Sequence, residues 1–351
     1  MRRGGRPLDE DRGAAVREIT AILVSWRDAV EVEAAVESLA AARRRIAAPG
    51  LKTSLVVVGN GGKSLRREVI LSLWPGASLV VNDANRGFGP AANQGSEMAS
   101  GDVILFLNPD TRAEGDPFSE LARGFASHPR AVALVPRLLD FEGRAGGAPG
   151  RRRLAPPDRE DQFTFQLRRL PGLASDAREL LLVDHLFPDN RGRRRFRYAD
   201  FDREVPFEVE QAAAAALAVK KDAFRRVGGF DETYVPAWFE DVDLCARLRR
   251  EGSILTWPDA RFRHRGGLSA KRLGYDRFLP IYYRNAVLYR RKHYRAPARF
   301  AYRALLASGM LLRLAALPFR RRMPRSRSEA ARAYLSTLAV AAGLGRAGNF
   351  R

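Results

Sequence analysis

The chain has 351 residues, of which 46% are hydrophobic and 9% aromatic, and this composition excludes general disorder because it supplies enough apolar surface for a core. The formal net charge of +21 favours anionic partners (nucleotide diphosphates, anionic lipids or nucleic acid) without choosing among them. The only cysteine, Cys245, excludes an internal disulfide framework and a cysteine-based zinc site.

Residues 1–17 are predicted to form a flexible basic arm. Their charged residues are not followed by an apolar segment, so they do not resemble a secretory signal. The length of the chain fits one large domain or two ordinary ones.

The first half of the chain predicts a parallel α/β sheet. Short apolar runs at residues 19–24, 55–58, 79–81 and 103–107 are predicted strands, and residues 30–46 and 91–99 have helical patterns. Strands that alternate with helices imply right-handed parallel connections. Each strand ends in small or polar residues, so one sheet edge is predicted to be a polar crevice. Neither a dinucleotide-binding glycine turn nor a P-loop pattern is present.

The strand at residues 103–107 stops at Asn108-Pro109-Asp110, because Pro109 lacks a backbone donor and disfavours helical geometry at Asn108. Asp110 is therefore expected at the carboxyl end of a buried strand, where open α/β sheets bind ligands. A carboxylate there can hold a divalent cation against a diphosphate. Taken alone, the segment would be interpreted as a solvated turn.

A glycine-rich segment, Asn85-Arg-Gly-Phe-Gly-Pro-Ala-Ala-Asn-Gln-Gly95, precedes that strand. Gly87 and Gly89 allow close approach to a ligand, and Arg86 and Asn93 are within reach of it. The alternative is an ordinary turn with one core aromatic residue.

An acidic cluster, Glu240, Asp241 and Asp243, lies in the second half. Crowding raises the proton affinity of at least one of these carboxylates, which suits a general base for an alcohol. Asp241 is predicted to be a helix N-cap with Asp243 in the first turn. The alternative is an acidic helix start that complements the helix dipole. The preceding region, residues 141–205, is predicted to form a loop over an acceptor site, with a helix at residues 162–170.

Taken in order, these motifs resemble family 2 glycosyltransferases with the GT-A fold, of the rhamnosyltransferase-like subgroup. The donor motif is the segment from Asn85 to Gly95, followed by Leu-Asn-Pro-Asp110. The acceptor motifs are Val227-Gly-Gly-Phe-Asp-Glu232, Trp238-Phe-Glu-Asp-Val-Asp-Leu244 and His264-Arg-Gly-Gly-Leu-Ser269. The resemblance covers residues 19–290 in matching order and spacing.

The resemblance implies an α/β GT-A catalytic domain at residues 18–290, with a nucleotide-sugar half at 18–140 and an acceptor half at 205–290. It implies Asp241 as the catalytic base, Glu240 in contact with a sugar, and Asp110 with His264 as ligands of Mg²⁺ or Mn²⁺. The implied donor-binding residues are Ser25, Trp26, Asn60, Arg86, Gly87, Asn93, Asn108 and Asp110.

Two departures from the family pattern affect these assignments. Gly59-Asn60 stands where relatives have an Asp that commonly binds the pyrimidine base, and residues 213–215 are three alanines where a Ser-Gly-Ala element is usual. The first makes nucleotide selection uncertain, and the second makes the acceptor contacts uncertain.

The implied activity is inverting transfer of a sugar from dTDP-rhamnose, or from a UDP- or GDP-sugar, to a hydroxyl of a glycan or lipid-linked acceptor in cell-envelope polysaccharide synthesis. One alternative is a non-catalytic relative that only binds a partner. Another is a basic nucleic-acid-binding protein, but no binding module is evident, so no nucleic acid partner is expected. Formation of a homo-oligomer is left open.

Residues 291–351 are predicted to be a basic helical extension. The apolar segment at residues 301–319 contains Arg303 and Arg313, so no transmembrane span is predicted. Between these arginines the helix is apolar on nearly all sides and must be buried against the domain, another subunit or lipid. Both arginines, with those at 320–322, favour anionic lipid. We expect a cytoplasmic protein attached peripherally to the inner face of the membrane; a helical lid is the alternative.

Overall fold

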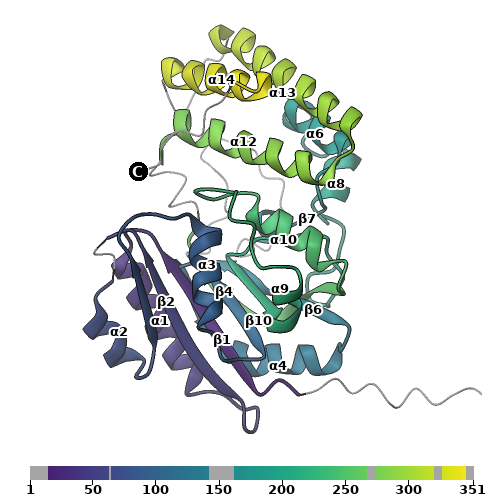
Figure 1. The fold of residues 1–351 in the computed structure, drawn as a ribbon. Coiled ribbons are helices and arrows are strands. Elements are labelled where there is room, and N and C mark those ends of the chain that lie inside the picture. Colours follow the sequence, from purple (N-terminus) through teal and green to yellow (C-terminus); the bar gives the residue numbers. More distant parts are fainter. Residues whose placement is uncertain (1–14, 63–64, 142–161, 267–272, 320–325, 345–351) are drawn as a thin grey trace, which may run out of the picture.

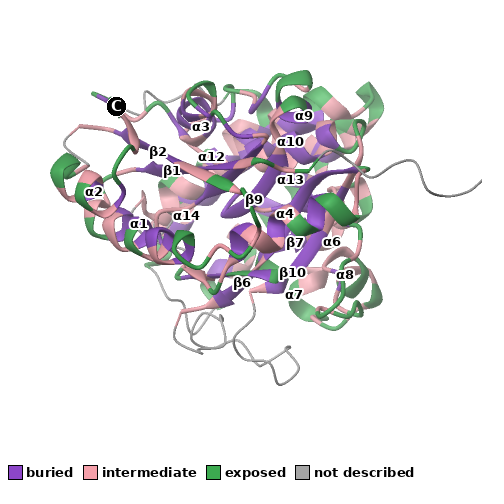
Figure 2. Ribbon diagram, turned by 90° about the horizontal axis from the view of Figure 1, so that it is seen from below, coloured by how far each residue is buried: buried purple, intermediate pink, exposed green. Residues whose placement is uncertain are grey.

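The structure is a computed structural model that describes residues 15–62, 65–141, 162–266, 273–319 and 326–344. A central sheet lies between two layers of helices, and a further group of helices lies above one end of it (Figure 1). Most sheet residues are buried between these layers (Figure 2). The predicted basic arm falls largely outside the described residues.

Eight strands form the sheet, in the order β3-β2-β1-β4-β9-β6-β10-β5. β1, β2, β3, β4, β6 and β10 run in one direction, and β5 and β9 run in the other. The sheet is therefore mostly parallel, as predicted. The strands are β1 (Glu18–Ser25), β2 (Lys52–Asn60), β3 (Ser78–Asn82), β4 (Val103–Leu107), β5 (Thr111–Glu114), β6 (Ala131–Asp140), β9 (Ala216–Lys220) and β10 (Ser253–His264).

Apolar side chains alternate along the strands and form a core on each face of the sheet. Ile19, Ala21 and Leu23 of β1 pack with α1 (Ala29–Arg43), α2 (Arg67–Leu73) and α4 (Pro117–Ser127). Ile22 and Val24 of the same strand pack on the opposite face, with α3 (Phe88–Glu97), α9 (Lys221–Arg226) and α10 (Glu240–Leu248). Successive side chains of a strand point to opposite faces of the sheet, so each strand contributes to both cores.

The described part of the region between the two halves of the sheet, residues 162–205, contains four short helices. These are α5 (Phe163–Gln166), α6 (Leu173–Leu180), α7 (Val183–Leu186) and α8 (Arg191–Phe196), and a small second sheet pairs β7 (Leu167–Arg168) with β8 (Gln211–Ala212). The single helix predicted at residues 162–170 is wrong, since α5 ends at Gln166 and the chain continues as β7.

The C-terminal helices are α12 (Tyr275–His293), α13 (Ala296–Ala316) with a 3₁₀ turn at Leu317–Phe319, and α14 (Arg327–Ala342). They share a third core that also includes Leu180, Tyr234 and Phe239. The expected boundary at residue 290 falls inside α12. By length and composition one described helix, Ala296–Phe319, could cross a membrane, although core helices of soluble proteins meet the same criterion.

Candidate active site

Several predicted site residues lie at the edge of the sheet where the parallel strands end. Ser25 ends β1, Asn60 ends β2, His264 ends β10, and Asp110 follows β4 after a short turn. These strands share one direction, so their carboxyl ends meet at one edge. The buried Ser25 hydroxyl has no hydrogen-bond partner within the described ranges. A ligand atom at this edge would satisfy it.

Asp110 and His264 lie together because β5, which begins directly after Asp110, pairs with β10 and sets Thr111 opposite His264. The nearest Asp110 oxygen is 3.3 Å from His264 Nε2, and Gly266 N–H donates to the same carboxylate at 3.0 Å. Burial alone would raise the pKa of Asp110, but the hydrogen bond and charge of His264, with the Gly266 N–H, hold this pKa below its ordinary value. The carboxylate is therefore kept ionised.

Three further groups surround this pair. Asn108 Nδ2 lies 3.3 Å from His264 Nε2, and Gln162 Oε1 lies 2.7 Å from His264 Nδ1. Arg265 N–H donates to the Asp110 carbonyl at 3.1 Å, and the Arg265 guanidinium reaches Glu31 on α1. The loop after β10 is thus tied to the first helix as well as to Asp110.

The residues present fit a divalent cation bound together with a diphosphate. Within the described residues no group of three or more His, Cys, Asp or Glu side chains converges, so Asp110 and His264 would be the only two such ligands. Mg²⁺ is usually held by one or two carboxylates with phosphate oxygens and water, and Mn²⁺ also accepts imidazole nitrogen. An ionised carboxylate facing an imidazole nitrogen at 3.3 Å matches this donor set.

Asn60 positions the glycine-rich loop. Its side-chain nitrogen donates to Asn85 Oδ1 and to Gly87 O, each at 2.9 Å, and its side-chain oxygen accepts from Arg86 N–H at 3.0 Å and from Asn82 at 3.3 Å. These four hydrogen bonds use the full capacity of the amide. A nucleotide base could contact Asn60 only by replacing one of them.

Gly87 and Asn93 link the donor motif to the acceptor motifs. Gly87 has φ +95°, and a Cβ there would lie 2.9 Å from the Val235 side chain. Asn93 accepts from Phe230 N–H at 2.8 Å and donates to the Phe230 carbonyl at 2.9 Å and to Glu232 at 3.0 Å. The described contacts of Asn93 are therefore with the Gly-Gly-Phe-Asp-Glu segment.

Trp26 directly follows Ser25 at the end of β1, and Arg86 belongs to the glycine-rich loop that Asn60 holds. The ring of Trp26 lies 3.2 Å from the position of a Cβ at Gly61, which explains the absence of a side chain there. The Arg86 side chain is exposed and can reach a ligand in the predicted crevice.

The acidic motif begins in an unusual turn. Trp238 and Phe239 both have positive φ, 75° and 74°, a region that non-glycine residues rarely adopt. The predicted N-cap at Asp241 is wrong, since Phe239 is the N-cap and α10 starts at Glu240. Because Trp and Phe both disfavour positive φ, the sequence gives no sign of this turn. Such strain persists where surrounding contacts enforce it and is typical of functional sites.

Glu240 and Asp241 are the carboxylates with raised proton affinity. Burial, and then the charge of Asp241, raises the pKa of Glu240 well above its ordinary value, and Glu240 Oε2 is buried without a partner in the described structure. Burial also raises the pKa of Asp241, opposed by the N–H groups of Val242 and Ala214 and by the charge of Arg168. Because the charge of Asp241 acts on Glu240, the two carboxyls titrate as a pair.

The two carboxylate centres lie near each other in the fold. Asn108 N–H donates to Ala215 O at 3.0 Å, and the adjacent Ala214 N–H interacts with Asp241. The alanines at residues 213–215 therefore connect the turn that holds Asp110 with the start of α10.

A residue of α12 holds the turn that precedes Glu240. Asn285 is fully buried and donates to the carbonyls of Ala237 and Trp238, at 2.8 and 3.0 Å. Arg284 donates to Val235 O and to the Asn285 side chain. The contacts that enforce the strained turn thus come from the C-terminal helices.

Asp243, the third acidic residue, faces basic groups. Its carboxylate accepts from His293 at 2.7 Å, from Arg247 at 2.8 Å and from Lys292 at 3.0 Å, and it is fully buried. Burial would raise its pKa, but these groups lower it to about 2. Asp243 therefore joins α10 to the end of α12.

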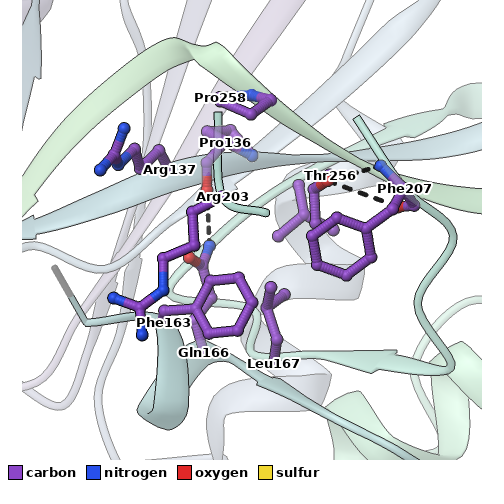
Figure 3. Close-up of a pocket in the computed structure, with 10 residues that line it drawn as sticks. Pro136, Arg137, Phe163, Gln166, Leu167, Arg203, Phe207, Thr256 and Pro258 are labelled. Atoms are coloured by element: carbon purple, nitrogen blue, oxygen red, sulfur yellow. Dashed lines mark hydrogen bonds between the residues drawn. The ribbon is translucent and has the colours of Figure 1, made fainter. Parts of the chain in front are cut away.

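Sequence reasoning missed three polar residues of this site: Gln162, Arg168 and Asn285. None belongs to a motif used above, and each acts through a contact distant in sequence, which spacing does not predict. A small pocket beside α5 is lined by none of the predicted site residues; its lining includes Phe163, Gln166 and Thr256 (Figure 3).

Comparison with known proteins agrees with this geometry. The sequence model described as "Glycosyl transferase family 2" matches residues 20–198, just over half of the chain. N-acetylglucosaminyl-diphospho-decaprenol L-rhamnosyltransferases of two Mycobacterium tuberculosis strains, CDC 1551 / Oshkosh and ATCC 25618 / H37Rv, are each 26% identical over 271 residues, which cover 72% of this chain and 81% of theirs.

Among solved structures, the mannosyltransferase PcManGT from Pyrobaculum calidifontis, in complex with GDP-Man and Mn²⁺, has a TM-score of 0.50 and 13% identity, covering 97% of this chain and 90% of that one. This likeness concerns the fold, a mostly parallel sheet with flanking helices. The predicted GT-A fold is confirmed, and the chain belongs to glycosyl transferase family 2.

Proposed function

We propose that this glycosyltransferase moves a sugar, with inversion, from a nucleotide-diphosphate sugar to a hydroxyl of a glycan or lipid-linked acceptor in cell-envelope polysaccharide synthesis. The principal support is the presence of two neighbouring carboxylate centres with opposite shifts of proton affinity. Asp110 is kept ionised, whereas burial raises the pKa of both Glu240 and Asp241. Environments that separate pKa values in this way are typical of sites with distinct electrostatic and acid–base roles.

In the proposed mechanism Asp241 accepts the proton of the acceptor hydroxyl. The acceptor oxygen then forms a bond to the anomeric carbon from the face opposite the diphosphate, and the bond between that carbon and the diphosphate oxygen breaks. Glu240, one position away on α10, contacts a sugar. Asp110 and His264 would hold Mg²⁺ or Mn²⁺, which when bound neutralises charge on the leaving diphosphate.

The proposed donor is dTDP-rhamnose, with UDP- and GDP-sugars as alternatives. Support for rhamnose comes from the relatives, whose names describe a rhamnosyl transfer. The acceptor of those enzymes is a glycan on a lipid diphosphate, so we propose the same acceptor class here. The free Ser25 hydroxyl and the exposed Arg86 would contact the donor.

A screen of nucleotide sugars with Mn²⁺ tests the activity. We expect release of a nucleoside diphosphate from one donor, faster when a lipid-linked glycan is added, and lost in Asp241→Asn. Nucleotide binding without release from any donor, with or without acceptor, would instead favour the non-catalytic alternative. Binding of nucleic acid in preference to every nucleotide would refute the proposal.

We also propose that the protein lies on the inner face of the cell membrane through α13. α13 belongs to the helical layer farthest from the sheet (Figure 1). Exposed apolar residues of α13 and of the 3₁₀ turn after it follow helical spacing and form an apolar ridge. This apolar ridge consists of Phe300, Ala304, Leu311, Leu312, Ala315 and Phe319. The net charge of +21 would attract an anionic bilayer surface, which supports lipid as the partner of the ridge.

The structure corrects one argument for this attachment. Arg303 donates to Ala341 O at 2.8 Å, and Arg313 donates to Leu180 O at 2.6 Å and to Glu179 O at 3.0 Å. Both guanidinium groups therefore bond to carbonyls of neighbouring helices and do not extend toward headgroups. The attraction to lipid would come from the apolar ridge and from other basic residues.

Flotation with anionic liposomes at low salt tests the membrane proposal. We expect Leu311→Glu combined with Phe300→Glu to reduce the bound fraction, since both side chains are more than half exposed and no buried contact is lost. Val30→Glu, at an equally exposed apolar position on α1, is the control. Equal binding of all three proteins would exclude the apolar ridge.

A further inference from the structure

Gln162 contacts His264 through both atoms of its amide. Its Oε1 lies 2.7 Å from His264 Nδ1, and its Nε2 donates to the His264 backbone carbonyl at 2.5 Å. The two residues are 102 positions apart, and Gln162 directly precedes α5 in the region between the two halves of the sheet. The implied metal ligand His264 is thus held by a residue outside every motif described above.

The contact with the His264 carbonyl shows which atom of the Gln162 amide is the donor and which is the acceptor. A backbone carbonyl only accepts, so the amide atom beside it is the NH₂ group, and the amide oxygen faces Nδ1. The oxygen also only accepts, so Nδ1 must carry a proton. His264 Nε2, which faces Asp110 at 3.3 Å, is then the nitrogen that would release its proton to bind a cation.

Gln162 is itself fixed in place. Its backbone N–H donates to Leu138 O on β6 at 2.9 Å, and the Phe165 ring stacks on the His264 ring with centroids 5.7 Å apart. Gln166 anchors the other end of α5 to β6 through Pro136 O at 2.7 Å, as the dashed line in Figure 3 shows. The helix therefore presents Gln162 to the imidazole from a supported position.

We propose that Gln162 is a positioning residue that fixes the tautomer and ring orientation of His264 for metal binding. The inference rests on the proposed metal site of Asp110 and His264. Outer hydrogen bonds of this kind typically change metal affinity by about 10–100-fold when they are removed. By this contact the acceptor-side region contributes to donor binding without touching the donor.

The test compares two substitutions on the same short segment. Gln162→Met keeps the length of the side chain but removes both contacts with His264. Gln166→Met is the matched control, because the described hydrogen bonds of the Gln166 side chain go to the backbone of Pro136 and Leu138 and not to His264. Titration calorimetry would measure Mn²⁺ affinity in the presence of UDP, dTDP or GDP. We expect a loss of about 10–100-fold in Gln162→Met and wild-type affinity in Gln166→Met, whatever its Tm.

A second readout reports the tautomer directly. The chain has four histidines, so ¹⁵N-histidine NMR can resolve them, and His264→Gln assigns the signal of interest. At a pH where the ring is neutral, we expect the Nδ1–H tautomer in the wild type and in Gln166→Met, and a mixture in Gln162→Met. An unchanged tautomer, or equal losses of Mn²⁺ affinity in both variants, would overturn the positioning role.

The outcomes separate this inference from the proposed function. If Mn²⁺ does not promote nucleotide binding in the wild type, the metal site fails and the positioning role fails with it. If the wild type binds Mn²⁺, Asp110→Asn does not, and Gln162→Met behaves as the wild type, only the positioning role is refuted.

Discussion

The two carboxylate centres of this enzyme are both largely buried, yet their protons are held with opposite strength. At Asp110 a histidine and a backbone N–H face the carboxylate and outweigh the cost of burial. At Glu240 the nearest charge is another carboxylate, and one oxygen has no described partner. Burial penalises the charged form in both cases, so the neighbours decide the sign of each pKa shift.

The two carboxylate centres therefore suit different chemistry, although their functional groups are the same. An ionised carboxylate suits a cation, and a carboxylate with raised proton affinity suits transfer of a proton from an alcohol. The following predictions test whether the two centres are separate in function, from the largest expected effect to the smallest.

Asp241→Asn should reduce turnover by roughly a hundredfold or more, because it removes the proton acceptor. Nucleotide affinity should be unchanged, since Asp110 is not altered. At neutral pH the Tm should not fall, because a buried carboxylate is replaced by a neutral amide. Steady-state kinetics, calorimetry and thermal unfolding measure the three quantities. Turnover near that of the wild type would transfer the role to Glu240.

Asp110→Asn should have the converse effect. The increase in nucleotide affinity that Mn²⁺ produces should disappear, because an amide oxygen is a much weaker ligand than an ionised carboxylate. The fold should remain, since Asn keeps the shape and the bond from the Gly266 N–H. Calorimetry with and without Mn²⁺ measures the difference; persistence of the metal effect would contradict the assignment.

Asp243 should contribute to stability and not to chemistry. Its folded-state pKa of about 2 lies below the ordinary value near 4, so its stabilisation is present above pH 4 and is lost as the pH falls toward 2. Asp243→Asn should lower stability at pH 7 by about 3 kcal/mol, which is a few degrees in Tm. The difference from the wild type should shrink below pH 4. A constant difference down to pH 2.5 would contradict this account.

The acid limb of the pH–turnover profile should lie above the range of an ordinary carboxyl group. Turnover needs an unprotonated base, and the pKa values of Glu240 and Asp241 are raised, so activity should fall as the pH falls through these raised values. The limb reports the pair as a unit. A limb near pH 4 would show that neither buried carboxyl acts as the base.

Arg168→Met should give the smallest effect. The charge of Arg168 lowers the pKa of Asp241, so its removal should shift the acid limb to higher pH with little change at the plateau. The neighbouring Arg169, which bonds to Glu210, offers a control of equal charge change. Identical profiles for both variants would exclude a specific role for Arg168.

The sequence predicted well those features that depend on local pattern. β4 spans Val103–Leu107, as predicted. The strand ends there because the following Asn-Pro lacks a backbone donor at the proline. Asp110 and His264 were expected to act together from the family resemblance, and they are in contact. Short continuous apolar runs likewise made the parallel strands recognisable.

Features that depend on distant contacts could not be predicted. The strained turn at Trp238 and Phe239 is enforced by Asn285, and nothing in the local sequence indicates positive φ. Arg303 and Arg313 were expected to face lipid because helical spacing does not reveal carbonyls on neighbouring helices. Gln162 is recognisable only once β10 and α5 lie together.

The hold of Asn285 on the turn before Glu240 has a consequence for synthesis of the enzyme. The ribosome releases residues 237 and 238 well before residue 285, so the donor edge of the sheet can form while the strained turn has no hydrogen-bond donor to fix it. A nascent chain without α12 therefore lacks both hydrogen bonds that Asn285 donates to this turn. We expect the start of α10, with Glu240 and Asp241, to become fixed only when α12 docks.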